Sequence, residues 1–316
     1  VDYVKYDWCS YGEIARKIFG EKYAALLPSD AVQIRALTDE KVQLDSNHKR
    51  TDEQAGRLKQ VNTELDAIIR KIKPEDKKRI ELEIFQEPYK IFRASLDKVK
   101  RDIVFSFCQY GMGNVWEWGQ QLGGNCWRTT GDIEDTWESL SAIGFSQGKC
   151  SPWSAPGRWN DPDMLVVGWV GWGPALHYTR LTTNEQYTHI SLWSLLAAPL
   201  LIGCDLNQLD AFTLNLLTND EVLAVNQDPL GKQAIQVKKT AEYEIWARDL
   251  DDGSKAVGLF NKTEKPLNIP VDMKELNVNG KPVLRDLWTQ ADLGKVCGHF
   301  EMKAQPHGVR LVKLTK

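Results

Sequence analysis

The sequence predicts an α/β protein in which residues 1–231 supply the later strands of a (β/α)8 TIM barrel and residues 232–316 form an antiparallel β-sandwich. Short apolar strands alternate with helical patterns up to the turn-rich residues 226–231, which is the rhythm of a parallel sheet. Beyond that segment, short alternating strands follow one another without a helical pattern, as in a sandwich. These strands are expected at residues 243–247, 255–260, 283–288 and 308–314.

The composition is that of an ordinary globular protein. Hydrophobic residues make up 42% and charged residues 26% of the 316 residues. A net charge of -3 gives no reason to expect nucleic acid or an anionic membrane as a partner. No apolar run is long enough to span a bilayer. The six cysteines show no CxxC and no zinc spacing, so neither a metal nor another cofactor is expected.

The chain opens with a short strand, residues 1–9, that ends in polar residues. A charged side chain at the C-terminal end of a barrel strand usually takes part in chemistry. Lys5 and Asp7 are two residues apart, so both point to one side of the strand. A neighbouring lysine favours the ionised form of a carboxylate, as a nucleophile requires. The alternative is an ordinary ion pair at a strand end.

A long helical segment follows, rich in good helix formers from about residue 13 to residue 100. Residues 28–86 are expected to form a helical hairpin that stands out from the barrel, and residues 88–100 a further amphipathic helix. The hairpin could bind a partner, provide contacts within a homo-oligomer or cover the site entrance. A solvated helical insertion is the favoured interpretation, because charge runs on helices are usually exposed faces.

Strands and helices then alternate, and polar residues follow the strands. Because the carboxyl ends of parallel strands share one rim, these polar residues are expected to lie together. The strand at 125–133 carries Arg128 and Asp132, and the strand at 159–167 carries Asp161 and Asp163. Further strands are expected at 103–111 and 198–203, and helices at 135–143 and from residue 182, with Thr183 or Asn184 as the cap.

Paired carboxylates beside a lysine and an arginine suit acid/base or nucleophilic catalysis. Nine of the twelve tryptophans lie between Trp116 and Trp193, and crowded indoles suit the flat apolar faces of sugar rings. A tryptophan-rich core is the alternative explanation. Together these features indicate glycoside hydrolysis.

Four blocks of the sequence resemble those of a known enzyme family. The chain resembles glycoside hydrolase family 27, the α-galactosidase and α-N-acetylgalactosaminidase family, in YVKYDWC, CWRTTGDIEDTW, RWNDPDMLVVG and LWSLLAAPLLIGCDL followed by NQDPLG. The resemblance implies an O-glycosyl hydrolase of carbohydrate metabolism that removes terminal α-linked galactose from oligo- or polysaccharides. It also implies a retaining double displacement, for which the two carboxyl groups lie about 5–6 Å apart.

The resemblance also implies residue roles. Asp7 matches the nucleophile and Asp132 the acid/base. Cys9 and Cys108 match a pair that is disulfide-bonded in relatives. Carboxylates around Pro162 could instead organise a turn, which leaves sugar contact by Asp163 open. The residues expected to bind substrate are Lys5, Trp8, Cys108, Gln109, Arg128, Asp163 and Met164.

Two departures from the family pattern bear on function. Relatives commonly carry Cys-Glu-Trp where this chain has Cys108-Gln109-Tyr110. That glutamate helps recognise the sugar's 2-substituent, so β-L-arabinopyranosidase and α-N-acetylgalactosaminidase specificities stay open beside galactose. The family's first three strands are also absent. An open half-barrel is unstable, so a barrel-completing segment, a companion chain or a domain swap is expected.

A non-catalytic fragment or subunit, which would bind a partner through its helical hairpin, is the alternative from a different functional class. Secretion or a periplasmic location is expected from the family and is compatible with six cysteines.

Overall fold

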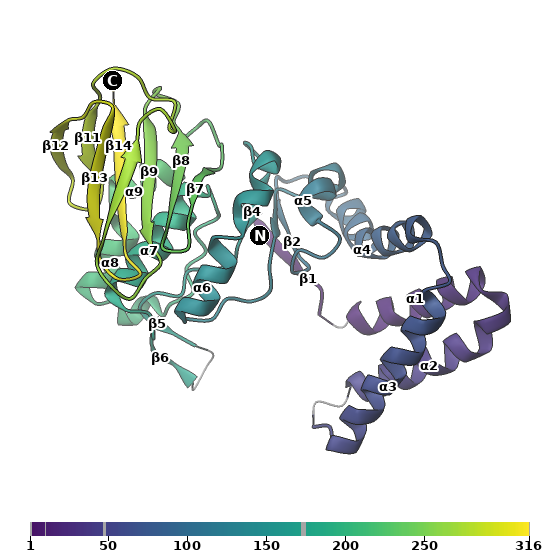
Figure 1. The fold of residues 1–316 in the computed structure, drawn as a ribbon. Helices are drawn as coiled ribbons and strands as arrows, with labels where there is room; N and C mark the ends of the chain where they lie inside the picture. Colours follow the sequence, from purple (N-terminus) through teal and green to yellow (C-terminus); the bar gives the residue numbers. More distant parts are fainter. Residues whose placement is uncertain (1, 10, 47–48, 172–174, 316) are drawn as a thin grey trace. The chain divides into compact units, whose positions relative to one another are not determined.

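The computed structural model describes residues 2–9, 11–46, 49–171 and 175–315. The chain divides into two compact units, Val1–Gly113 and Asn114–Lys316, called here the N-terminal and C-terminal units (Figure 1). The domain boundary expected near residue 231 lies inside the C-terminal unit and stays a prediction. Within the described ranges no helix is long and apolar enough to cross a membrane.

The N-terminal unit contains one βαβ element. Strand β1 (Tyr3–Asp7) pairs in parallel with β2 (Val104–Cys108), with Asp7 opposite Cys108. Helix α4 (Pro74–Leu96) lies between them in the chain and packs on the strands through aromatic rings. Tyr89 stacks on Phe107 with ring centroids 4.2 Å apart, and Phe92 stacks on Tyr6 at 4.5 Å. This packing directs the odd-numbered Lys5 and Asp7 to the opposite face of the sheet.

Three helices precede α4, namely α1 (Tyr11–Leu26), α2 (Ala31–Ser46) and α3 (Asp52–Ile69), with a short 3-10 turn η1 (Pro28–Asp30) after α1. Their apolar faces and the first turns of α4 form one buried cluster that includes Ile34, Val61 and Ile84. The inserted part is therefore a packed group of helices with its own core. The expectation of a two-helix hairpin over residues 28–86 was too simple.

The expected start of a helix at Pro88 was wrong, because α4 runs through this proline. A proline inside a helix has no N–H for the carbonyl four residues earlier. Here that carbonyl belongs to Ile84, and it accepts a hydrogen bond from the Tyr11 hydroxyl at 3.2 Å. The freed acceptor is thus satisfied by α1, and the helix continues.

The C-terminal unit begins with short parallel strands. β3 (Cys126–Arg128) pairs with β4 (Trp159–Asp161). Both are shorter than expected, and the strand expected at 198–203 is reduced to one parallel bridge between Leu165 and Ile202. The remaining elements before the sandwich are α5 (Val115–Trp118), η2 (Gly119–Leu122), α6 (Trp137–Gly144), η3 (Gln147–Trp153), β5 (Trp169–Val170), β6 (His177–Tyr178), α7 (Thr183–Leu195), η5 (Leu206–Gln208), α8 (Ala211–Thr218) and α9 (Asp220–Asn226).

The sandwich consists of a six-stranded antiparallel sheet in the order β12-β11-β14-β9-β8-β7 and a two-stranded sheet β10-β13. The four expected strands correspond to β8 (Tyr243–Asp249), β9 (Lys255–Asn261), β11 (Val283–Asp286) and β14 (Val309–Thr315). Sequence reasoning missed β7 (Ile235–Lys239), β10 (Leu267–Asp272), β12 (Ala291–Lys295) and β13 (His299–Ala304). β12 shows why: all its residues are exposed, so no apolar alternation marks it.

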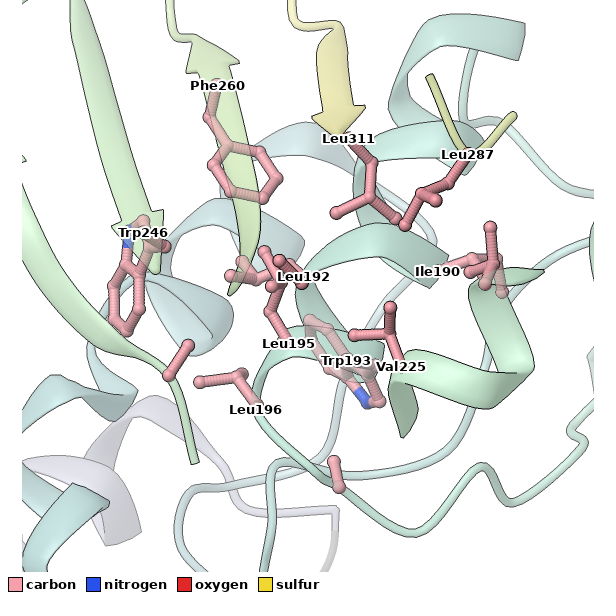
Figure 2. Close-up of a cluster of buried hydrophobic side chains, with 14 of the residues drawn as sticks. Ile190, Leu192, Trp193, Leu195, Leu196, Val225, Trp246, Phe260, Leu287 and Leu311 are labelled. Carbon is pink, nitrogen blue, oxygen red and sulfur yellow. The ribbon is translucent and has the colours of Figure 1, made fainter. Parts of the chain in front are cut away.

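Helix α7 joins the sandwich to the preceding segments. Nearly every residue of α7 is buried, and it packs against β9 and β14 (Figure 1). Figure 2 shows Leu192, Trp193 and Leu195 of α7 in one cluster with Trp246, Phe260 and Leu311 from the sheet. The cap of α7 is Thr182, in a capping box with Glu185, one residue before the expected Thr183.

The close approach of α1 to α2 gives a stability prediction. A methyl group at Gly20 would lie 2.6 Å from the Thr38 hydroxyl oxygen, so Gly20→Ala should lower the free energy of unfolding by about 1–3 kcal/mol. Gly56 in α3 has open space around it, and Gly56→Ala should raise that free energy by up to about 1 kcal/mol. Urea denaturation followed by circular dichroism measures both. Equal effects of the two substitutions would contradict this packing.

Candidate active site

Asp7 is the last residue of β1, and its carboxylate is both exposed and fixed. Its Oδ1 accepts hydrogen bonds from the Trp8 backbone N–H at 2.7 Å and from the Tyr110 hydroxyl at 2.9 Å. Lys5 lies on the same face of β1, opposite Ser106. A carboxylate that is oriented by two donors and open to solvent has the properties that a nucleophile needs.

Trp8 and Gln109, which were expected to bind substrate, make contacts inside the N-terminal unit. Trp8 packs edge-on against Tyr11 and Phe85, and Gln109 is fully buried with its amide donating to the Met112 carbonyl at 3.0 Å. These contacts point both side chains into the unit rather than toward Asp7. Sugar contact by Trp8 or Gln109 stays a prediction.

Cys108 is buried and Cys9 is exposed, and both carry thiols in this structure. The parallel register explains why no disulfide joins them. It places Asp7 opposite Cys108, and Cys9 lies two residues further along with a left-handed φ of 33°. The disulfide implied by the family resemblance is therefore not present here.

Asp132 and Arg128 come together in the C-terminal unit. Arg128, at the end of β3, is 2% exposed, and its Nη2 donates to Asp132 Oδ1 at 3.1 Å and to the Thr130 carbonyl at 3.3 Å. The Asp132 side chain is 76% exposed. It is thus held by a fixed cation while its carboxyl group is open to solvent, which suits an acid/base.

Asp163 is buried and lies on the other side of the same guanidinium. Its Oδ1 is 2.9 Å from Arg128 Nη1, and its Oδ2 accepts the Ile133 backbone N–H at 2.9 Å. Its own N–H donates to Asp161 Oδ1 at 2.9 Å, and its backbone has a left-handed φ of 96°. The contacts agree with the turn-organising alternative for both aspartates. Asp163 orders the loop that carries Asp132.

Met164 follows Asp163 and is partly buried. A methyl group at Gly203 would meet its sulfur at 2.8 Å, so Met164 packs closely on the segment that bridges to Leu165. Its expected role in the sugar pocket stays a prediction.

Sequence reasoning missed a charge network that anchors the far end of the Asp132 loop. Asp135 is buried, and Arg180 donates to its carboxylate from Nη2 at 2.6 Å and from the backbone at 2.8 Å. His177 Nε2 lies 3.2 Å from the same carboxylate. Burial raises the pKa of Asp135, but the bonds from Arg180 and His177 outweigh it and hold the pKa below its usual value. The Ala175 carbonyl and Asp135 raise the pKa of His177.

Tyr110 was also missed as a site residue. The available signal was the departure from the family's Cys-Glu-Trp together with the glycines that follow at 111 and 113. Within the described ranges, no cluster of three or more His, Cys, Asp or Glu side chains is arranged to hold a metal ion.

Comparison with known proteins identifies the family. The model of the family described as alpha galactosidase A matches residues 69–228, half of the chain, and the model of the alpha galactosidase C-terminal beta sandwich domain matches residues 240–314. The chain belongs to the alpha-galactosidase family, glycoside hydrolase family 27. Its fold class is accordingly that of the later part of a (β/α)8 barrel followed by a β-sandwich.

Comparisons with individual relatives support the same family assignment. Alpha-galactosidase 2 of Arabidopsis thaliana is 38% identical over 233 residues, which is 73% of this chain and 56% of that protein. Among solved structures, a family 27 β-L-arabinopyranosidase from Geobacillus stearothermophilus is 33% identical with a TM-score of 0.68, covering 73% of this chain and 54% of that one. Alpha-galactosidase I from Mortierella vinacea is 25% identical with a TM-score of 0.68, and 73% and 63% are covered.

The chain therefore spans between about half and three-fifths of the length of the curated relatives it matches. The segment that the alpha galactosidase A model matches includes the block that contains Asp132.

The different surroundings of the two aspartates on Arg128 give a prediction. Asp163→Asn removes a charge from a buried pair and should lower the free energy of unfolding by about 3–5 kcal/mol. Asp132→Asn affects an exposed carboxyl and should change that free energy by less than about 1 kcal/mol. Thermal and urea unfolding of the two proteins make the test. Equal losses would show that Asp163 does not have the structural role assigned to it.

Proposed function

We propose that this chain carries both catalytic carboxyl groups of a retaining α-galactosidase that cleaves terminal α-linked galactose. The observation that carries the proposal is that both carboxyl groups are exposed to solvent and oriented by fixed donors. Asp7 is exposed and oriented by two hydrogen bonds to one oxygen, and Asp132 is exposed and held by a buried arginine. Asp7 ends β1, and Asp132 follows the last residue of β3 by four residues, so both come after strands of the predicted barrel, where catalytic residues of such barrels lie.

The reaction would proceed in two displacements. An Asp7 oxygen attacks the anomeric carbon, the bond to the leaving oxygen breaks, and Asp132 gives that oxygen its proton. Asp132 then takes a proton from water, the water oxygen bonds to the anomeric carbon, and the Asp7 carboxylate is released. The sugar thus leaves with its original anomeric configuration.

We further propose that additional chain covers the outer side of β1 in the working enzyme. The support lies in the burial of the two strands. Phe105 to Cys108 of β2 are fully buried, whereas every residue of β1 is partly or fully exposed. A barrel strand with both neighbours in place is buried on both faces. The missing cover could be a further segment or a companion chain.

A β-L-arabinopyranosidase is the second candidate. The solved enzyme of that specificity is 33% identical to this chain with a TM-score of 0.68, whereas alpha-galactosidase I from Mortierella vinacea is 25% identical with a TM-score of 0.68. Gln109 in place of the family's usual glutamate adds a second reason to test it. A panel with the aryl α-galactoside, the aryl β-L-arabinopyranoside and the aryl α-N-acetylgalactosaminide compares kcat/KM and separates the specificities.

The first test is hydrolysis of 4-nitrophenyl α-galactoside by the purified chain, alone and with a segment that supplies further barrel strands. Asp7→Asn should abolish turnover, because an amide is a poor nucleophile. Release of nitrophenol measures the rate. Full activity of the Asp7→Asn protein would disprove the nucleophile assignment. If the wild type hydrolyses no glycoside of the panel, either alone or with the added segment, the proposed function is disproved.

Asp132→Asn should separate substrates by their leaving groups. An amide cannot protonate the leaving oxygen, so kcat/KM should fall by about 100-fold or more on galactosides with poor leaving groups. The loss should be much smaller on 2,4-dinitrophenyl α-galactoside, whose leaving oxygen needs little protonation. The same fractional loss on both substrates would rule out Asp132 as the acid.

A further inference from the structure

Tyr110 contributes the one side-chain hydrogen bond to Asp7 that the described residues show, and its backbone conformation is unusual. It follows β2 by two residues in a tight turn, in which the Met112 N–H donates to the Gln109 carbonyl at 3.1 Å. Tyr110 and Gly111, the central residues, have φ values of 61° and 81°. A left-handed conformation costs a bulky residue about 1–3 kcal/mol, and such strain is often found where a side chain must be aimed.

The turn aims the tyrosine hydroxyl back over the ends of β1 and β2. There it donates to Asp7 Oδ1 at 2.9 Å, and the Trp8 N–H donates to the same oxygen at 2.7 Å. The position of Trp8 is itself fixed, because its N–H also lies 2.9 Å from the Cys108 carbonyl in the continued β ladder. Both donors use Oδ1, so rotation of the carboxylate is restricted and Oδ2 is presented for attack.

We propose that Tyr110 is the positioning residue of the nucleophile, and that its hydroxyl supports chiefly the second displacement. This inference rests on the proposed glycosidase function. In the first step, the charge on Asp7 is lost as its oxygen bonds to the anomeric carbon. In the second step, water bonds to that carbon, Asp132 takes the proton, and the electron pair of the breaking ester bond returns to Asp7. A hydroxyl donor stabilises the carboxylate that forms.

The predicted signature of Tyr110→Phe follows from this asymmetry. Loss of a hydrogen bond to a charged group should lower kcat on 2,4-dinitrophenyl α-galactoside by about 10- to 100-fold. Because the glycosyl-enzyme would accumulate, KM should fall together with kcat, and a burst of dinitrophenol equal to the enzyme concentration should precede steady turnover. Methanol, which accepts the glycosyl group, should accelerate the variant more than the wild type.

Tyr6→Phe is the matched control. Tyr6 lies on the opposite face of β1, against Tyr89 and Phe92, and should keep wild-type kcat, KM and burst. Tyr110→Trp is the second variant. It keeps a ring N–H donor and should retain more of kcat than Tyr110→Phe. Each protein is assayed well below its own midpoint of thermal unfolding, so that a fall in stability does not enter the rates.

The outcomes separate the two proposals. If the wild type hydrolyses the substrate and Tyr110→Phe lowers kcat and KM together with a burst, the positioning role is supported. If the wild type is active and Tyr110→Phe keeps its kcat, or loses kcat at unchanged KM without a burst, the role of Tyr110 is overturned while the function stands. If the wild type, assayed together with the segment that supplies further barrel strands, hydrolyses none of the three glycosides, the function fails and the role of Tyr110 fails with it.

Discussion

The buried guanidinium of Arg128 is the interaction on which the candidate acid/base depends. A cation with only 2% of its surface exposed is costly unless its charge is compensated. Asp163 and Asp132 provide that compensation from two sides. Asp163 reaches its place only with a left-handed backbone, which costs about 1–3 kcal/mol and is maintained by its neighbours.

The same arrangement links the site to the core of the C-terminal unit. The carbonyl of Asp163 accepts the indole N–H of Trp193 at 2.7 Å, and Trp193 belongs to the cluster between α7 and the sandwich. The chain of contacts therefore runs from the exposed Asp132 through Arg128 and Asp163 to the largely buried helix α7. The sandwich, which carries none of the candidate catalytic residues, contributes to the site by holding α7 in place.

The sequence predicted the carboxylates better than the strands that bear them. Lys5 and Asp7 on one face of a terminal strand followed from alternation alone, and the structure pairs this strand in parallel with β2, with α4 between them in the chain, as the predicted strand–helix–strand order requires. The prediction of a strand at 198–203 was wrong because a short buried apolar run has the same composition whether it is a strand or an extended loop. Only the bridge at Ile202 remains of it.

Other errors came from contacts between distant residues. Pro88 predicts a helix start from local chemistry, and nothing near it in the chain shows that Tyr11 will satisfy the Ile84 carbonyl. Likewise, the sequence predicted a helix that begins at Asp135. Nothing near Asp135 in the chain shows that Arg180, 45 residues later, will donate to its carboxylate. Hydrophobic periodicity is local and can be read from a sequence, whereas the partner of a buried polar group depends on the tertiary fold.

The two candidate catalytic carboxyl groups differ in the kind of donor that holds them. Asp7 accepts bonds from a peptide N–H and a phenol, both neutral, so its oxygen is oriented without a full opposite charge that would oppose attack on carbon. Asp132 is held by a cation, but Asp163 shares that cation and is much more deeply buried. A carboxyl group that must hold a proton in one step and release it in the next is poorly served by an unshared positive charge. Because Asp163 shares Arg128, the guanidinium is held in place by a buried partner, and the exposed Asp132 carboxyl is oriented by a cation whose position is already fixed.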